Sequence, residues 1–408
     1  MNAPFTVPPA LAIRPEAARA PTSGIVEVFN YGRGRPGLIP LWVGEGDRPT
    51  PSFIGEAAAR SIAAGETFYT WQRGLPELRE AIARYHGRLY GRPFDPERFF
   101  VTTGGMHALQ LAVRLVAGAG DEVVVPSPVW PNFVGALTII GAKPIPVPMD
   151  FDSGTGWRLS LDRVADAVTE RTRALVVNSP ANPTGWTASR DDLQGLLDIA
   201  RSRRLWIVAD EIYNRFAYDA PDGLSPSFKE VMEPEDRILF VQTLSKNWAM
   251  TGWRLGWLEA PPELGQAIEN LVQYSTSGIP VFVQRAGIAA LDEGEDFLAG
   301  TVASAREGRD IVCAGLAGTG VELPPPAGAF YAFLRVPGIV DPTALALRLV
   351  DEANVGLAPG SAFGPGGETG FRLCFARKAE DLHEAVRRLR PALAAIAARV
   401  LTDGRARA

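Results

Sequence analysis

The segment RILFVQTLSKNWAMTGWRLGW, residues 237–257, joins a short apolar run to a lysine and, eight residues later, to an arginine. The run ILFV is typical of a buried strand, and the polar residues that follow it end the strand. Lysine is scarce in this chain: of its 41 basic residues, all are arginine except those at positions 143, 229, 246 and 378. Lys246 therefore stands out, because it directly follows a predicted strand and lies among tryptophans.

The chemistry of lysine gives this position a function. An amine in apolar surroundings can lose its proton, attack a carbonyl and form a Schiff base, whereas a guanidinium stays protonated to a pH above about 12. Arg254 has the complementary property, a permanent charge that matches a phosphate. The usual alternative for a lysine is a solvated surface position, which the neighbouring tryptophans disfavour. A Schiff-base amine near a phosphate anchor indicates pyridoxal phosphate.

Five further segments have the same form as this strand, each a brief β-branched or aromatic run ended by Gly, Pro, Ser or a charge. They are RFFVTTGG (98–105), DEVVVPSP (121–128), RALVVNSP (173–180), RLWIVADE (204–211) and RLGWLEAP (254–261). Helix-length amphipathic segments such as SRDDLQGLLDIARSRR lie between several of them, and this alternation predicts a largely parallel sheet covered on both faces. The expected fold class is α/β: a large domain with a mostly parallel sheet between helices, plus a smaller α+β domain.

We expect three parts along the chain. Residues 1–45 mix Pro, Gly and Arg with little periodicity, which predicts an N-terminal arm that packs with the small domain. Residues 46–285 contain the alternation of strands and helices and are expected to form the large cofactor-binding domain. Residues 286–408 contain longer helical patterns and two strand signals, near 328–336 and 370–376, which predict the small C-terminal domain.

Composition limits the classes of function. The chain has 408 residues and a net charge of -5 without a basic run, so a nucleic-acid-binding surface is not expected. No stretch reaches the roughly 18 apolar residues of a membrane span, and the N-terminus lacks the pattern of a secretory signal. Cys313 and Cys374 lie outside any CxxC pattern and suit a reducing compartment. We expect a cytoplasmic protein with no membrane or nucleic-acid partner and no metal site.

Polar residues after the predicted strands are candidates for a site, because ligands bind beyond the carboxyl ends of the strands in open α/β sheets. Gly104 and Gly105 open a predicted helix, whose free N–H groups suit a phosphate. Asp210 is either an ordinary helix N-cap or the partner of a protonated pyridine nitrogen. Tyr213, three residues later, is then placed to donate to the ring oxygen. No GxGxxG follows a strand and no GxxxxGK[ST] occurs, so dinucleotide and P-loop sites lack their fingerprints.

Three more residues have both a structural and a functional interpretation. Asn182 lies in SPANPTG, where Asn-Pro-Thr-Gly is by itself a good turn. Trp130 in SPVWPNF is either a core residue or a ring that stacks on a planar cofactor. Arg372 is either a surface arginine at the start of a strand or a bidentate clamp for a carboxylate. Their joint occurrence with the residues above indicates one site.

These motifs together resemble the class I/II aminotransferases, which are pyridoxal-phosphate enzymes of fold type I similar to aspartate aminotransferase. The similarity covers most of the chain and runs through LWVGEGDRPTP, YTWQRGLPELREAIA, VTTGGMHAL, NSPANPTG, ADEIY, TLSKNWAMTGWRLG and GFRLCFA. NPTG followed by SKxxxxTGxRxG is highly specific for this family.

The resemblance implies a role for each matching residue. Lys246 would hold pyridoxal 5'-phosphate as the internal aldimine and later shuttle the proton. The other implied cofactor contacts are Asp210 at the pyridine nitrogen, Tyr213 and Asn182 at the ring oxygen, Trp130 on the ring face, and Thr243, Arg254, Gly104, Gly105, Met106 and the Tyr69 of a neighbouring subunit at the phosphate. Gly44 and Arg372 would bind the substrate's α-carboxylate, with Trp130 and Asn182 also in contact with the substrate. The position of Tyr69 implies a homodimer with shared active sites.

Departures from the family pattern bear on the substrate. Gly46 stands where the family usually has proline, and Thr243 where it usually has serine. Met106 occupies a position at which the aspartate-handling branch can carry a lysine that contacts the side-chain carboxylate, so we expect a neutral, apolar or aromatic amino donor. Arg73, in the loop after Tyr69, is either an exposed loop residue or a cation for the neighbouring site, which leaves an aspartate-type transaminase open.

The leading hypothesis is a pyridoxal-phosphate-dependent aminotransferase that moves the amino group of an L-amino acid to a 2-oxo acid, 2-oxoglutarate or pyruvate. A carbon–sulfur β-lyase on the same scaffold is the first alternative. It would release pyruvate and ammonia without an oxo-acid acceptor. A non-enzymatic, cofactor-binding regulatory domain is the last alternative, because the residues before the similarity show no helix-turn-helix pattern.

Overall fold

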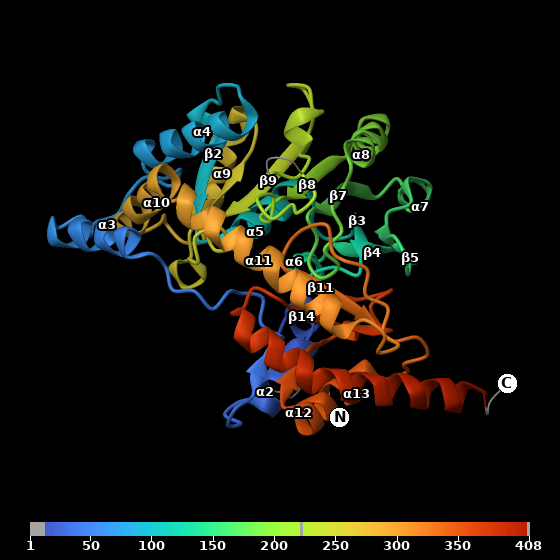
Figure 1. The fold of residues 1–408 in the computed structure, drawn as a ribbon. Coiled ribbons are helices and arrows are strands. Elements are labelled where there is room, and N and C mark those ends of the chain that lie inside the picture. Colours follow the sequence, from blue (N-terminus) through green and yellow to red (C-terminus); the bar gives the residue numbers. More distant parts are fainter. Residues whose placement is uncertain (1–12, 221–222, 406–408) are drawn as a thin grey trace.

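The computed structural model describes residues 13–220 and 223–405 (Figure 1). Expectations about residues 1–12, the first part of the N-terminal arm, lie outside these ranges. None of the helices described is both long and apolar enough to cross a membrane. Within the same ranges, no cluster of His, Cys, Asp and Glu is suited to a metal ion.

A seven-stranded sheet forms the centre of the larger part of the molecule. Its strand order is β2-β10-β9-β8-β7-β3-β4, and β10 runs antiparallel to both of its neighbours while the other pairs are parallel. The strands are β2 (Phe99–Thr102), β3 (Glu122–Ser127), β4 (Lys143–Pro148), β7 (Thr172–Asn178), β8 (Trp206–Asp210), β9 (Ile238–Thr243) and β10 (Gly256–Glu259). The six strands expected from the sequence are all present, and the mostly parallel sheet confirms the predicted fold class.

The sequence does not predict β4, because KPIPVP carries proline at alternate positions. Proline cannot donate to a strand ladder and is confined to edge strands. β4 is such an edge strand, since it pairs with β3 alone within the sheet. A hairpin of β5 (Asp150–Asp152) and β6 (Gly156–Arg158) follows it.

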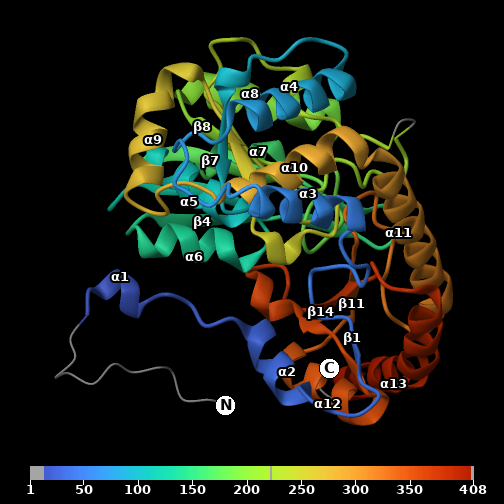
Figure 2. The same ribbon diagram turned by 90° about the vertical axis from the view of Figure 1, so that its left-hand side faces the viewer.

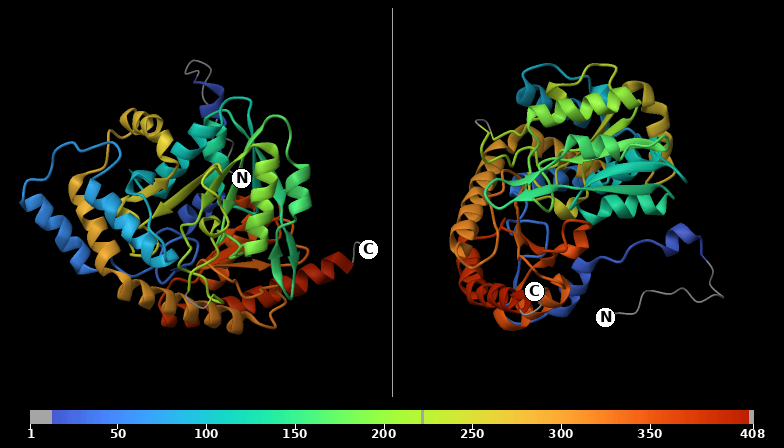
Figure 3. Two further views of the ribbon diagram at one scale, coloured as in Figure 1. Left: turned by 90° about the horizontal axis from the view of Figure 1, so that it is seen from above. Right: turned by 90° about the vertical axis from the view of Figure 1, so that its right-hand side faces the viewer.

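Helices cover both faces of the large sheet. In Figure 2, α8 lies above the strands and α6 below them, and Figure 3 shows the layers from two further directions. The helices of this part are α3 (Ser52–Ala63), which packs on α10, α4 (Pro76–Tyr90), α5 (Gly105–Val116), α6 (Pro131–Ile139), α7 (Leu161–Asp166), α8 (Arg190–Arg203), α9 (Gly265–Gln273) and α10 (Val281–Glu293). Local signals set their ends: Ser189 and Asp192 form a capping box before α8, and Gly91 ends α4 with a φ of 65°.

The C-terminal part is built on an antiparallel sheet of order β11-β14-β13. Its elements are α11 (Glu295–Leu316), β11 (Tyr331–Arg335), α12 (Pro342–Ala353), β12 (Val355–Gly356), β13 (Ala358–Pro359), β14 (Gly370–Cys374) and α13 (Ala379–Arg405). The expected domain boundary between residues 285 and 286 falls inside α10, which packs on α3 and α4 of the larger part.

The N-terminal segment touches both parts of the molecule. α1 (Pro15–Ala18) contacts α6, and the Arg14 guanidinium donates to the carbonyl of Ile139. α2 (Gly24–Gly32) packs on α12, and β1 (Ile39–Pro40) pairs in parallel with β12. Figure 2 shows this course, with α1 below α6 and α2 beside α12.

The register of the large sheet gathers polar residues at one edge. Asn178, the last residue of β7, pairs with Asp210, the last residue of β8. Thr243 ends β9 opposite Gly256 of β10. Because β7, β8 and β9 are parallel, their carboxyl ends meet at this edge, where ligands bind in open α/β sheets.

Candidate active site

A cavity of about 560 Å³ opens at this edge of the sheet, within the usual size of a small-molecule site. Its walls come from the strand ends of the large sheet, from β11 and β14 of the C-terminal part, and from the N-terminal segment. The predicted site residues that line it are Gly44, Gly105, Met106, Trp130, Asn182, Asp210, Tyr213, Thr243, Lys246, Arg254 and Arg372. The structure thus places these widely separated residues around one space.

Lys246 lies three residues beyond the end of β9, and its side chain is half-buried. Its Nζ donates a hydrogen bond to the carbonyl oxygen of Gly44 at 2.7 Å. Burial lowers the pKa of the Lys246 amine to about 8; Arg372 and Arg254 act in the same direction, while Cys374 and Glu45 act against it. A substantial fraction of this amine is therefore neutral and nucleophilic near physiological pH.

Asp210 ends β8 and is 2 % exposed. Its Oδ1 accepts a hydrogen bond from the backbone N–H of Ile212 at 3.2 Å, and no helix follows, so the helix N-cap interpretation is wrong. Burial raises the pKa of Asp210 to about 7, and no described Lys, Arg or His forms an ion pair with it. Among the residues that the structure describes, this buried carboxyl therefore has no ion-pair partner.

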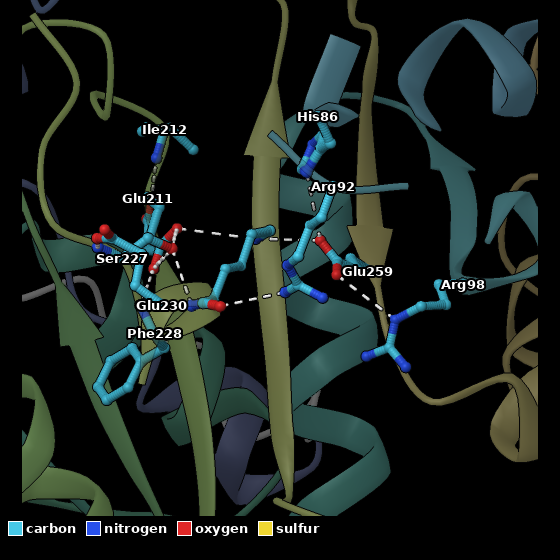
Figure 4. A network of polar contacts seen from close by, with 11 residues as sticks. His86, Arg92, Arg98, Glu211, Ile212, Ser227, Phe228, Glu230 and Glu259 are labelled. Carbon is cyan, nitrogen blue, oxygen red and sulfur yellow. Dashed lines mark hydrogen bonds and ion pairs between the residues drawn. The ribbon is translucent and has the colours of Figure 1, made fainter. Parts of the chain in front are cut away.

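The next residue, Glu211, does not line the cavity and belongs to a buried polar network (Figure 4). Its carboxylate accepts from the Ser227 hydroxyl at 2.7 Å and from the Phe228 N–H at 3.2 Å. Lys229 Nζ lies 3.8 Å from Glu211 and 3.0 Å from Glu259. These contacts hold Glu211, the residue directly after Asp210, in the core.

The amino end of α5 forms an anion-binding surface. Gly104, the N-cap residue, has a φ of +78°, and a Cβ there would lie 2.8 Å from Arg254 Nη2. Arg254 Nη1 donates to the carbonyl of Thr251 at 2.8 Å, and within residues 13–220 and 223–405 no carboxylate pairs with its guanidinium. The hydroxyl of Thr243 lies 2.9 Å from that of Ser245. Helix N–H groups, a hydroxyl and a free guanidinium together suit a phosphate.

A second cation, Arg372, also lines the cavity. Arg372 is 3 % exposed, and its Nη1 donates to Asn182 Oδ1 at 2.9 Å while its Nη2 donates to the Trp42 carbonyl. Its Nε has no hydrogen-bond partner, and no acidic side chain described pairs with it. The guanidinium also lies over the Tyr331 ring, 4.7 Å from its centroid. A buried cation without an anion indicates an anionic ligand.

Two residues that the sequence singles out lie elsewhere. Tyr69 is 95 % exposed and does not line the cavity of its own chain. Arg73 is not an exposed loop residue: its side chain is 18 % exposed and pairs with Glu97 and, at 2.7 Å, with Glu269. Because these carboxylates already neutralise Arg73, it is not free to bind an acidic substrate.

Several lining residues are not predicted from the sequence. They are Ile25, Val26, Phe29, Trp42, Val43, Asn132, Asn178, Ile212, Val241, Ser245 and Tyr331. Ile25, Val26, Phe29, Val241 and Tyr331 lie in helices or strands as ordinary apolar or aromatic residues, and only Asn178 and Ser245 follow the strand-end pattern that identifies the others. Tyr331 and the α2 residues reach the cavity through the packing of distant segments, which no local spacing encodes.

Three groups in the cavity therefore lack a partner of opposite character on the described chain. Asp210 lacks a cation, Arg254 and the start of α5 lack an anion, and the Lys246 amine lacks an electrophile. Pyridoxal phosphate supplies a protonatable ring nitrogen, a phosphate and an aldehyde, so the residues fit it. The fold and the cavity together define a pyridoxal-phosphate enzyme of fold type I.

Comparison with known proteins identifies the family. The model of Aminotransferase class I and II matches residues 36–389, and the chain belongs to this family. It is 36% identical over 353 residues to the aspartate aminotransferase of Thermotoga maritima, and this match covers 86% of this chain and 90% of that protein. The protein is thus a pyridoxal-phosphate-dependent aminotransferase, which confirms the predicted family, enzyme class and cofactor and sets aside the non-enzymatic alternative.

Solved structures agree with this assignment. A mutant aspartate aminotransferase of Thermus thermophilus is 33% identical with a TM-score of 0.86, covering 93% of this chain and 99% of that chain. The alanine aminotransferase of Pyrococcus furiosus is 28% identical with a TM-score of 0.87, and the match covers 94% of this chain and 99% of that chain. The two structures carry different substrate names, so similarity alone does not select the amino donor.

Proposed function

We propose that the amino donor is an L-amino acid with a neutral, apolar or aromatic side chain, and that the acceptor is a 2-oxo acid, 2-oxoglutarate or pyruvate. The lining of the cavity supports this proposal. Lys246, Arg254 and Arg372 are the Lys and Arg residues that line it within the described ranges. Because each has a role toward the cofactor or the α-carboxylate, none is left on this chain for a side-chain carboxylate.

The remaining walls are suited to an apolar side chain. Ile25, Val26 and Phe29 of α2 line the cavity together with Met106 and Trp130. Burial of apolar surface against such walls contributes about 0.8 kcal/mol per methylene, roughly fourfold in affinity. A charged side chain would instead lose its hydration without gaining a partner.

The names of the relatives point in two directions. Two of those above are aspartate aminotransferases and one is an alanine aminotransferase. Aspartate as donor requires a further cation, and Arg73 does not fit because it is paired with Glu97 and Glu269. A cation from a neighbouring subunit is the remaining route to an aspartate-type enzyme.

Pyridoxal phosphate, when bound, supplies an aldehyde that condenses with an amine and a ring that accepts an electron pair. We propose that Lys246 carries the cofactor and moves a proton at the substrate's Cα. Asp210 keeps the ring nitrogen protonated by ion pairing. The remaining contacts are Arg254, Thr243 and the backbone of residues 104–106 at the phosphate, Trp130 on the ring face, and Asn182 and Tyr213 at the ring oxygen.

Arg372 would bind the donor's α-carboxylate in bidentate geometry, and Gly44 and Asn182 complete this end of the site. With the carboxylate fixed there, the Cα–H bond is the one presented for cleavage. A β-lyase would use the same contacts but expel a group from Cβ, so it is distinguished by its products.

A panel of donors tests these proposals. Purified holoenzyme is mixed with leucine, phenylalanine, alanine or aspartate, one at a time and without an acceptor, while the visible band of the cofactor is followed. We expect leucine or phenylalanine to react at least about tenfold faster than aspartate, a difference of about 1.4 kcal/mol. The reverse order refutes the proposed donor class, and sustained turnover by Lys246→Ala refutes the role of Lys246. Pyruvate and ammonia from a cysteine conjugate without an acceptor would identify a β-lyase.

We also propose a homodimer. Large apolar side chains are exposed on one loop, Phe68 at 83 %, Tyr69 at 95 % and Trp71 at 62 %, and Tyr274 is 89 % exposed. Such exposure is typical of a surface that a partner covers, and it leaves Tyr69 free to reach a neighbouring phosphate site. Sedimentation equilibrium of the holoenzyme should give a dimer mass, and a monomer that retains full activity would contradict the proposal.

The chain has three parts in our proposal. We propose an N-terminal arm, a large domain and a small domain, with the change between the last two moved from residue 285 into α11. The arm is assigned to the small domain because β1 pairs with β12 and α2 packs on α12.

Two free cysteines, Cys313 and Cys374, support a cytoplasmic location.

A further inference from the structure

Tyr331 is a buried residue of the cavity without a role in the site proposed above. It is the first residue of β11, is 0 % exposed and lines the cavity. Its hydroxyl lies 2.8 Å from the hydroxyl of Tyr213, and the two rings meet edge to face, with centroids 5.6 Å apart at 88°. Two buried phenols therefore share one hydrogen bond beside the proposed position of the cofactor ring.

The direction of this hydrogen bond follows from counting protons. Each phenol has one proton to donate, and burial raises the pKa of both Tyr213 and Tyr331, so both stay protonated. If Tyr213 donates to the ring oxygen of the cofactor, its oxygen can only accept from Tyr331. The order of donation is then from Tyr331 to Tyr213 to the ring oxygen.

The surroundings of Tyr331 are built to hold its hydroxyl in this place. A Cβ on Gly44 would lie 2.6 Å from the Tyr331 hydroxyl oxygen, so a glycine is needed there for this contact. The Tyr331 ring also supports the Arg372 guanidinium, 4.7 Å from the ring centroid. One side chain therefore contacts both the proposed ring-oxygen end and the proposed carboxylate end of the cavity.

We propose that Tyr331 is a positioning residue that donates to Tyr213 and thereby directs the Tyr213 proton to the ring oxygen of the cofactor. The proposal rests on the proposed role of Tyr213. Consecutive hydrogen bonds polarise one another, so the bond from Tyr331 makes Tyr213 a stronger donor. A stronger donor stabilises negative charge on the ring oxygen and lowers the pH at which the cofactor linked to Lys246 loses its proton.

The variant Tyr331→Phe tests this role, because it removes the hydroxyl and keeps the ring beneath Arg372. The pH dependence of the visible band of the resting holoenzyme is recorded without substrate. We expect its apparent pKa to rise by about half to one unit, which corresponds to one hydrogen bond of ordinary strength. We expect kcat to fall by about 3- to 10-fold, with the donor KM within about twofold of its original value.

Tyr218→Phe is the matched control. Tyr218 is 2 % exposed, and its hydroxyl donates to the carbonyl of Ala329 at 2.6 Å, two residues before Tyr331 in the chain. This variant removes a buried phenol hydroxyl from the same region without touching the cavity, so the visible band should titrate as in the original protein. An equal shift in both variants, or no shift in Tyr331→Phe, overturns the proposal.

Tyr213→Phe separates this proposal from the assignment on which it rests. It should raise the apparent pKa of the visible band by at least as much as Tyr331→Phe. If Tyr213→Phe leaves the band unchanged, the proposed function of Tyr213 fails. If Tyr213→Phe shifts the band and Tyr331→Phe does not, the role of Tyr331 alone fails.

Discussion

Replacing Lys229 by methionine should destabilise this protein far more than replacing an exposed lysine. The side chain of Lys229 is 0 % exposed, and its amine lies 3.8 Å from the carboxylate of Glu211 and 3.0 Å from that of Glu259. The amine also lies 3.3 Å from the centroid of the Phe240 ring. Methionine has a similar volume, so Lys229→Met removes the charge and leaves little cavity.

The expected magnitude follows from the carboxylates left behind. Removing one member of a buried ion pair lowers the free energy of unfolding by about 3–5 kcal/mol, because the remaining charge is buried without compensation. Glu211 keeps its bonds from Ser227 and Phe228, whereas Glu259 keeps the more distant Arg98, at 3.6 Å. The double variant Lys229→Met/Glu259→Gln removes the less supported charge and should recover about half of the loss.

The pH dependence of this loss has a definite sign. Burial alone would raise the pKa of Glu259, but Lys229, His86 and Arg98 together outweigh burial and hold that pKa below its usual value. In wild-type protein Glu259 therefore stabilises the fold above its unfolded pKa, and this contribution is lost as the pH falls through the lower folded pKa. Without Lys229, burial raises the pKa of Glu259, so the variant binds a proton on folding and the difference from wild type shrinks toward pH 5.

Urea denaturation of the holoenzymes at pH 8 and pH 5 measures these effects, with Lys143→Met as the control. Lys143 also pairs with a buried glutamate, Glu122, but its side chain is 65 % exposed and Glu122 keeps Arg171 at 2.6 Å. Lys143→Met should lower the free energy of unfolding by less than about 1 kcal/mol. Equal losses in the two single variants, or a loss for Lys229→Met that grows toward pH 5, would refute the reasoning.

Three further predictions concern the cavity. Arg372→Lys replaces a planar guanidinium by a compact ammonium, so the donor KM should rise by about 10- to 100-fold in steady-state assays while the visible band of the cofactor stays unchanged. An unaltered KM would contradict the proposed carboxylate site. Gly104→Ala should weaken cofactor binding by about tenfold in equilibrium dialysis, because the φ of +78° at Gly104 disfavours a side chain and a Cβ there would meet Arg254. Gly120→Ala, at a φ of +87° with no atom within 4 Å of the added Cβ, should leave cofactor binding unchanged. The rate at which apoprotein forms the visible band with pyridoxal phosphate should rise with pH through about 8, since the neutral amine of Lys246 reacts; a rise centred near pH 10 would mean an unperturbed lysine.

The strand ends were predictable because two physical rules act locally. Short apolar runs ended by polar residues identify buried parallel strands, and parallel strands bring their carboxyl ends to one edge. Asn178 and Asp210 therefore become neighbours through the register of β7 and β8. The same rule finds Thr243 and, a few residues later, Lys246.

Residues outside the large sheet follow a different logic. Tyr331 lies in an antiparallel strand of the C-terminal part, where FYAFLR reads as ordinary core, and only tertiary packing places its hydroxyl against Tyr213. Likewise, Phe29 reaches the cavity because α2 packs on α12, some 300 residues later in the chain. Arg73 is the opposite case: its loop position suggests exposure, but Glu97 and Glu269 from other segments bury it.

Lys229 and Lys246 show what separates a structural amine from a reactive one. Both are rare lysines in an arginine-rich chain; Lys229 is buried and Lys246 is half-buried. The amine of Lys229 lies within 4 Å of two carboxylates and forms ion pairs with both. The amine of Lys246 donates to a neutral carbonyl, no carboxylate among the described residues forms an ion pair with it, and burial is the largest cause of its lowered pKa. Burial therefore makes a nucleophile only where no carboxylate pairs with the amine, and the carboxylates that pair with Lys229 come from other segments, which the sequence around that lysine does not reveal.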